Sequence, residues 1–201
     1  MTGVITEQHT VEADGVTIRT AVLASGDIDA INAEVSVDHD VLRSSGIRNL
    51  EKKFRSIARV AFAPSVLSIA ASFLDATPRL VRALFFDKTP ERNWFVGWHQ
   101  DRTVALNRRL ELPGWGPWTR KDGVDHVQPS RAVLNQMVTI RLHVDDADEE
   151  GGCPRVIPGS HRFGILTQGE IDRMVATATP KPASPPVVTR WSCVRLFCIP
   201  R

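Results

Sequence analysis

Short strand-like runs separated by turn-forming residues fill the middle of this 201-residue chain, and they constrain its fold more than any other feature. The runs are "RLVRALFFDKTP" at 79–90, "NWFVGWHQD" at 93–101, "VLNQMVTIRLHVDDAD" at 133–148 and "CPRVIPGSH" at 153–161. Each is rich in branched, aromatic or aliphatic residues and is bounded by Pro, Gly or Asp. Runs of this kind favour a β-sandwich or barrel over an alternating βαβ fold.

The N-terminal part, 1–78, has a mainly helical pattern. Residues 16–24 alternate loosely, as a strand does, and apolar residues at helical spacing follow Asp27, which is a plausible helix cap. The stretch 48–78 predicts a helix, a loop and a second helix, which starts at Ser65 and stops at Pro78. A helical part therefore precedes the β-rich part.

Two later segments complete the outline. Residues 107–130 contain many turn formers and little periodicity, which predicts a long loop of the kind that lines a site. Further on, "EIDRMVATA" predicts a short helix. We predict a single domain over 1–201, with 1–78 mainly helical, 79–166 as the β core and 167–201 as an atypical tail.

Charge and hydropathy exclude several classes of function. The chain has 25 Lys and Arg against 23 Asp and Glu, and a formal net charge of +2 is too small an excess to indicate nucleic acid or an anionic membrane as a partner. Its N-terminus does not resemble a signal peptide, and its apolar stretches are shorter than a bilayer requires. Three cysteines are too few for a disulfide framework. We expect a cytoplasmic protein.

The stretch "GWHQDRTV" at 97–104 carries the chemistry. On a strand, His99 and Asp101 would point to the same side and Gln100 to the opposite side. One imidazole and one carboxylate then converge, which suits a divalent metal ion, and a second histidine would complete the facial triad of non-haem Fe(II) oxygenases. Three ligands on one face leave the opposite positions open for a co-substrate and dioxygen. By itself His-x-Asp is a weak signal, because a polar turn is the more common explanation for it.

Several segments in order carry a more specific resemblance. These are "LFFDKTPERNWFVGWHQD", "PGWGPWTRKDGVDHVQP", "VTIRLHVDDAD" and "GGCPRVIPGSHRFG". Together they resemble the phytanoyl-CoA dioxygenase family of Fe(II)- and 2-oxoglutarate-dependent oxygenases over roughly residues 80 to 166. The resemblance implies a double-stranded β-helix, which is a cupin-like jelly roll with flanking helices. It also implies Fe(II) as the metal and 2-oxoglutarate as the co-substrate.

The resemblance assigns roles to individual residues. It makes His99 and Asp101 iron ligands, and it makes Lys88 a contact of 2-oxoglutarate, for which an ammonium supplies a point charge. Trp98 and Gln100 flank the ligands as candidate pocket residues. In the predicted loop, candidate substrate contacts are Trp115, Trp118 and Lys121.

The C-terminal part departs from the family pattern. In the family, the second ligand histidine and an arginine that binds 2-oxoglutarate follow the "PGSH" segment, but no histidine follows His161 here. His161, His143 and His126 are weak candidates for the third ligand, and no arginine matches the family position. We interpret the tail as truncated or altered, and a shifted reading frame near residues 185 to 195 would explain it. The last strands of the jelly roll are then missing, and iron binding and turnover are reduced.

These observations predict a dioxygenase that hydroxylates a small-molecule substrate and converts 2-oxoglutarate to succinate, with activity that is reduced or lost in this chain. Two alternatives stay open. One is a pseudoenzyme, or small-molecule-binding module, that keeps the pocket without catalysis. The other is a cupin-like metal enzyme that uses its own substrate as the chelator in place of 2-oxoglutarate.

Overall fold

The computed structural model describes residues 11–38, 46–74, 76–88, 95–144, 153–183 and 191–200, the last ten by their backbone. The helices are α1 (Val11–Asp14), α2 (Ser25–Ser36), η1 (Leu50–Lys52), α4 (Arg55–Ala61), α5 (Pro64–Leu74), α6 (Arg131–Leu134), η3 (Ser160–Phe163) and α7 (Gln168–Thr177). The strands are β1 (Gly46–Arg48), β2 (Pro78–Lys88), β3 (Val104–Leu106), β4 (Trp118–Lys121), β5 (Val124–Val127), β6 (Val138–His143), β7 (Arg155–Val156), β8 (Lys181–Pro182) and β9 (Trp191–Pro200).

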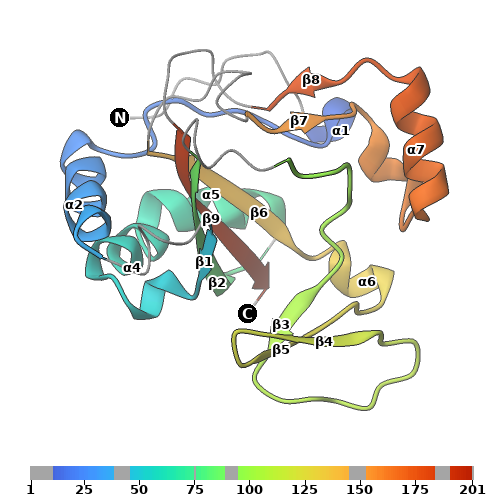
Figure 1. The fold of residues 1–201 in the computed structure, drawn as a ribbon, viewed down its shortest axis with the longest axis horizontal. Coiled ribbons are helices and arrows are strands. Elements are labelled where there is room, and N and C mark those ends of the chain that lie inside the picture. Colours follow the sequence, from blue (N-terminus) through green and yellow to red (C-terminus); the bar gives the residue numbers. More distant parts are fainter. Residues whose placement is uncertain are drawn as a thin grey trace.

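The main sheet has the strand order β1-β2-β9-β6, and every pair in it is antiparallel. The C-terminal strand β9 lies between β2 and β6, so that Leu196 is opposite Ala83 on one side and Ile140 on the other. Figure 1 shows the two long strands β2 and β9 crossing the molecule with β6 beside them. Segments far apart in the sequence therefore share one sheet.

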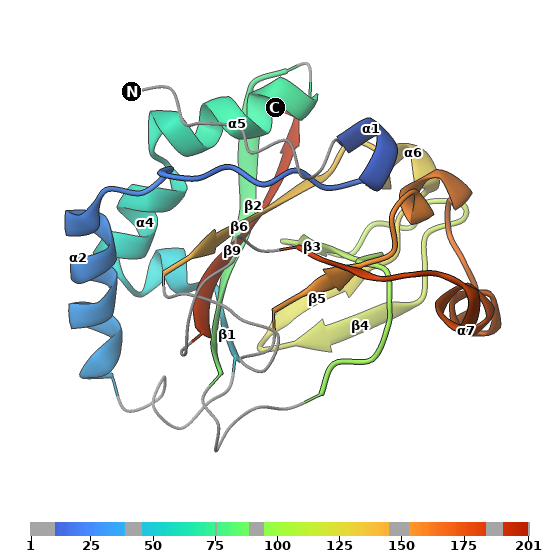
Figure 2. The ribbon, with the colours of Figure 1, turned by 90° about the horizontal axis from the view of Figure 1, so that it is seen from above.

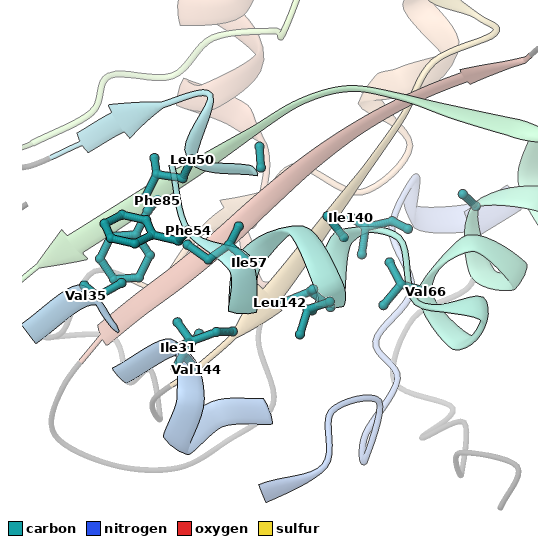
Figure 3. Packing of buried hydrophobic residues seen from close by; sticks show 14 residues of the cluster. Ile31, Val35, Leu50, Phe54, Ile57, Val66, Phe85, Ile140, Leu142 and Val144 are labelled. Carbon is teal, nitrogen blue, oxygen red and sulfur yellow. The ribbon is translucent and has the colours of Figure 1, made fainter. Parts of the chain in front are cut away.

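Helices α2, α4 and α5 cover one face of this sheet (Figure 2). Side chains from both layers form the buried core between them, and Figure 3 shows how they interlock. The helices contribute Ile31, Ile57 and Val66, each fully buried. From the strands, Phe85 and Leu142 meet them. Removal of this apolar surface from water is the main stabilising contribution of such a core.

A second sheet, of order β3-β5-β4, lies on the opposite side of the main sheet (Figure 2). Because side chains alternate along β2, Arg82 points away from the helical face that its neighbour Ala83 joins. The Arg82 guanidinium donates a hydrogen bond to Nε2 of His126 on β5, and both side chains are buried. This contact joins the two sheets through polar groups, next to the buried apolar side chains Leu84, Val104 and Val127.

The remaining C-terminal elements are a short strand pair and two helices. Strands β7 and β8 form a short antiparallel pair, and η3 and α7 lie between them in the sequence. Helix α7 starts with a capping box, in which the Thr167 hydroxyl accepts from the Glu170 backbone N–H and the Glu170 carboxylate accepts from the Thr167 backbone N–H. This reciprocal arrangement satisfies two donors at the helix end and fixes where α7 begins.

The fold class agrees with the sequence prediction, since strands with flanking helices are present and the sheets are consistent with a jelly roll that is not closed in the described residues. Strand β2 over Pro78–Lys88 matches the first predicted run, and α7 includes most of the predicted helix "EIDRMVATA". The end of the tail, Trp191–Pro200, forms strand β9, which no pattern in the sequence indicated.

Several local predictions were wrong. Residues 16–24 form no strand, and α2 begins at Ser25 with Ala24 as its N-cap, before the predicted cap at Asp27. Helix α5 begins at Pro64 rather than Ser65 and ends at Leu74. Pro78 instead opens β2, because the first residue of a strand is a position that tolerates proline.

Two errors concern the β-rich part. The predicted loop 107–130 contains the β4–β5 hairpin, and the predicted strand 93–101 is not a strand in its described residues, 95–101. Of the described helices, none is long and apolar enough by itself to cross a membrane, although α4 and α5, which meet at a 43° bend, would be so together by length and composition.

Candidate metal centre

His99 and Asp101 lie in a segment without regular secondary structure, just before β3. The His99 Nε2 and Asp101 Oδ1 atoms lie 3.7 Å apart, and their side chains are 51% and 39% exposed. Adjacent ligands of one octahedral ion, each about 2.1 Å from it, lie ~3 Å apart. The two donor atoms are therefore near the separation that a shared divalent ion requires, and both are open to solvent.

The imidazole of His99 is oriented for binding through Nε2. Its Nδ1 lies 2.7 Å from the Gly97 carbonyl oxygen, which only accepts hydrogen bonds, so Nδ1 carries the proton. In the neutral ring, Nε2 then has the lone pair, and it lies 3.7 Å from the Asp101 carboxylate. A carbonyl that fixes the tautomer in this way is the usual outer partner of a metal-binding histidine.

Asp101 also faces a cavity of about 1110 Å³. Strand β6 forms one side of the cavity, and the N-terminal segment at 15–23 forms another. Its charged lining is mainly basic: Asp101 is the one carboxylate among the described lining residues, and the arginines are Arg19, Arg102, Arg131 and Arg141. A cavity with this lining suits a ligand that carries carboxylate or phosphate groups.

The segment that carries His99 and Asp101 is held by the chain that leads into α7. The Gln100 side chain forms two hydrogen bonds to this chain, with the Gly164 carbonyl at 2.7 Å and the Leu166 backbone N–H at 2.9 Å. Arg102 Nη1 donates to the Leu166 carbonyl at 3.0 Å. These contacts join segments that are far apart in the sequence, so no local pattern could indicate them.

The other residues that the sequence predicted for the site are spread over several elements of the fold. Lys88 ends β2 with its backbone opposite Trp191, and its side chain lies outside what the structure describes. Trp98 is half-buried, with the Arg155 guanidinium 6.0 Å from its ring centroid. The candidate substrate contacts Trp115, Trp118 and Lys121 belong to the β4–β5 hairpin and the turn before it, and the described cavity lining does not include them.

The three weak candidates for the third ligand are not brought to the pair. His126 is buried between the two sheets, His143 ends β6, and His161 in η3 packs against Gly15. Within the described ranges, no group of three or more His, Cys, Asp or Glu side chains is placed to hold one ion. His143 and His161 nevertheless line the same cavity as Asp101.

Burial keeps His143 neutral. Desolvation, with a smaller contribution from the charge of Arg141, lowers the pKa of His143 from 6.5 to about 4. An imidazole with this pKa is uncharged at neutral pH. It offers the cavity a polar group that does not add to the positive charge of the arginines.

Comparison with known proteins places the chain in a family. The family described as phytanoyl-CoA dioxygenase (PhyH) matches residues 11–189, which is most of the sequence. The chain therefore belongs to the phytanoyl-CoA dioxygenase family, as its motifs predicted. A comparison with curated protein sequences gave no significant match.

Solved structures support the same fold. HygX from Streptomyces hygroscopicus, solved with nickel and 2-oxoglutarate bound, is 14% identical, and the match covers 94% of this chain and 84% of HygX with a TM-score of 0.61. SnoN from nogalamycin biosynthesis, a non-haem α-ketoglutarate-dependent epimerase, is 14% identical over 94% of this chain and 79% of its own, with a TM-score of 0.57. AviO1 from Streptomyces viridochromogenes Tue57 is 18% identical over 94% and 84%, with a TM-score of 0.56.

The donor set fits a divalent ion with Fe(II)-like preferences. One imidazole nitrogen and one carboxylate oxygen converge, and with the proton of the neutral ring on Nδ1 the lone pair of Nε2 is available to a metal. His99 and Asp101 would hold the metal, and the cavity beside Asp101 would receive whatever binds next to it. The described residues supply two ligands for such an ion, and a third ligand is not among them.

Proposed function

We propose that this chain is an Fe(II)- and 2-oxoglutarate-dependent dioxygenase that hydroxylates a small-molecule substrate, with His99 and Asp101 as metal ligands. The observation that carries this proposal is the convergence of His99 Nε2 and Asp101 Oδ1 at 3.7 Å beside a large, basic cavity, in a chain of the phytanoyl-CoA dioxygenase family. The metal, when bound, would supply the activation of dioxygen.

The cavity supports an acidic co-substrate. 2-Oxoglutarate is a dianion, and four arginines line the space next to Asp101. Arginine presents a planar set of donors that matches a carboxylate, so a lining of this kind can bind and orient such a ligand. The volume of about 1110 Å³ exceeds what 2-oxoglutarate needs and leaves room for a substrate.

Two exposed apolar side chains lie next to the proposed metal ligands in the sequence, and they support substrate binding there. Phe95 is 85% exposed and Val96 is 50% exposed, and both immediately precede the segment 97–101. Large apolar residues that remain open to solvent next to a candidate site are typical of a binding surface. A substrate with an apolar portion would fit this edge.

We expect weak iron binding. Two ligands hold a labile ion less tightly than three, and the described residues supply two. Turnover is therefore expected to be slow and to depend on an excess of Fe(II). Weak iron binding is also expected of the pseudoenzyme alternative, in which the cavity binds a small molecule and no reaction follows.

Succinate formation tests the proposal. The purified chain is incubated without oxygen with excess Fe(II) and 2-oxoglutarate, oxygen is admitted, and succinate is measured by mass spectrometry. We expect succinate from the unmodified chain, little or none from His99→Ala and Asp101→Ala, and an unchanged amount from Asp29→Ala. Asp29 is an exposed carboxylate on α2 and serves as the matched control.

Each outcome separates the hypotheses. Equal succinate from His99→Ala and the unmodified chain would show that the metal ligands are assigned wrongly. Binding of 2-oxoglutarate with no succinate from any variant would favour the binding module. Oxidation of a substrate without succinate would favour a cupin-like enzyme in which the substrate is the chelator.

A further inference from the structure

Gln100 lies between the two predicted metal ligands, and its side chain does not join them. Its Nε2 donates to the Gly164 carbonyl at 2.7 Å, and its Oε1 accepts from the Leu166 backbone N–H at 2.9 Å. Both functional atoms of the amide are therefore used, and both partners are backbone groups of one short stretch.

The two hydrogen bonds of the Gln100 side chain follow the pattern that a residue of a neighbouring parallel strand would form through its backbone. In a parallel β-ladder, one residue donates to the carbonyl of residue j−1 and accepts from the N–H of residue j+1 on the next strand. Gln100 does the same with residues 164 and 166, but through its side chain. The amide is a peptide-like group, so it can replace a backbone unit with one donor and one acceptor.

Such a replacement matters because residues 95–103 belong to no strand. A strand's backbone is fixed by its ladder, and this segment has none in the described structure. Two further side-chain bonds act at the same place: Arg102 Nη1 donates to the Leu166 carbonyl at 3.0 Å, and Gln168 Nε2 donates to the Trp98 carbonyl at 3.5 Å. The bonds of Gln100 are the shortest of the set and lie between the ligands themselves.

We propose that Gln100 is a positioning residue for the metal centre, which fixes the backbone of 99–101 so that the His99 imidazole and the Asp101 carboxylate converge. This inference rests on the proposed function, because it takes His99 and Asp101 as the metal ligands. In this role Gln100 needs no contact with the metal or with the substrate. Only a side chain with one donor and one acceptor at this length can make both bonds.

Two substitutions by side chains of similar size separate the contributions of the two Gln100 hydrogen bonds. Gln100→Met keeps the length and removes both bonds. Gln100→Glu keeps the acceptor for the Leu166 N–H but places a carboxylate oxygen against the Gly164 carbonyl, which repels it. The matched control is Gln136→Met, because Gln136 is exposed and lies after α6, outside the cavity lining.

The test measures Fe²⁺ affinity by calorimetry without oxygen, together with hydrogen exchange at the Leu166 amide. We expect Gln100→Met to weaken Fe²⁺ binding about tenfold, the lower end of the range that changes around metal ligands produce, because Gln100 acts on the backbone of the ligands and not on their side chains. The exchange of the Leu166 amide should rise in the same variant. Gln100→Glu should weaken Fe²⁺ binding while it leaves the Leu166 amide more protected than Gln100→Met does, and Gln136→Met should change neither quantity.

Failure of this inference is distinguishable from failure of the proposed function. If the unmodified chain binds Fe²⁺ and both Gln100 variants bind it within twofold as tightly, the positioning role is wrong and the metal site stands. If the unmodified chain binds no Fe²⁺, the metal site itself is wrong and the positioning role falls with it. Should Gln100→Met fail to fold, Gln100→Glu decides the matter, since it retains one of the two bonds.

Discussion

At the scale of single residues, Arg82 and His126 show how a polar contact can join two sheets. The His126 Nδ1–H donates to the Val124 carbonyl at 3.0 Å, so its Nε2 is the acceptor for the Arg82 guanidinium. Burial is the main cause that lowers the pKa of His126, and the charge of Arg82 lowers it further. Arg82 itself, with its pKa lowered to about 10 mainly by burial, stays charged at neutral pH.

Removal of the Arg82 guanidinium should be costly. Arg82→Met leaves the buried Nε2 of His126 without this donor, and an unsatisfied buried polar group costs on the order of 1–3 kcal/mol. Urea denaturation would measure the loss. The control is Arg59→Met, which breaks an exposed ion pair with Asp27 and should cost less than about 1 kcal/mol. Equal losses in the two variants would contradict the proposed connection between the sheets.

His143 predicts a dependence of stability on pH. Its pKa is lowered to about 4 in the folded chain against 6.5 unfolded, so between these values the unfolded chain binds more protons. The stability that the neutral His143 contributes should be fully present above pH 6.5. As the pH drops toward 4, the free energy of unfolding should fall by up to about 1.4 kcal/mol per pH unit.

A variant isolates the contribution of His143. His143→Asn keeps a polar side chain that does not titrate, so its unfolding free energy should fall less steeply between pH 6.5 and pH 4.5. Urea denaturation at several pH values gives both slopes. Parallel slopes for the two proteins would mean that His143 is not held neutral by burial.

The candidate metal centre was predictable only in part. Period-two alternation predicted that His99 and Asp101 share one side of a strand; the two side chains lie 3.7 Å apart, although residues 95–101 form no strand. It could not indicate the support from Gly164 and Leu166, because those partners are distant in the sequence and bind through backbone groups. The role of Lys88 stays a prediction.

At the scale of elements, the β4–β5 hairpin is the clearest missed prediction. The turn between its strands is Asp122-Gly123, with φ of 49° and 76°, and Asp-Gly is a strong sequence signal for a two-residue hairpin turn. The turn formers on both sides, such as Pro113 and Gly116, made the whole stretch resemble a loop. In addition, Asp122 accepts from Arg48 Nη1 at 2.6 Å, which ties the turn to β1.

Gly123 should therefore be sensitive to substitution. A Cβ at φ of 76° is strained although the space around it is open, so Gly123→Ala should destabilise the chain by about 1–2 kcal/mol. Gly26→Ala is the matched control: Gly26 lies in α2 with open space at its Cβ, and alanine in a helix should stabilise by about 0.5–1 kcal/mol. Thermal melts compare the two. A Gly123→Ala variant as stable as the unmodified chain, or more stable, would contradict the turn assignment.

At the scale of the whole molecule, β9 determines how the main sheet is assembled. It pairs with β2 along its length and with β6 over six residues, so it lies between two strands that do not pair with each other. The β-rich core and its flanking helices were predictable from strand-like runs and helical spacing. The central place of β9 was not, because strand order depends on pairing between distant segments and no local pattern records it.

A proline in β9 tests its central place. Leu196→Pro removes the backbone N–H of a residue that has a strand on each side, and we expect a loss on the order of 2–4 kcal/mol beyond that of Leu196→Ala. The alanine variant shortens the same side chain but keeps the N–H, so the difference between the two reports the backbone alone. Chemical denaturation gives that difference. Proline and alanine variants of equal stability would place residue 196 outside the sheet.

The central claim is that His99 and Asp101 together hold the metal ion, and the most direct measurement is the Fe²⁺ affinity of the purified chain without oxygen. The account predicts one weak site per chain, a loss of at least about tenfold in affinity for both His99→Ala and Asp101→Ala, and no change for Asp29→Ala. Fe²⁺ bound with the same affinity by all four proteins would contradict it, because the ion would then be held by other residues.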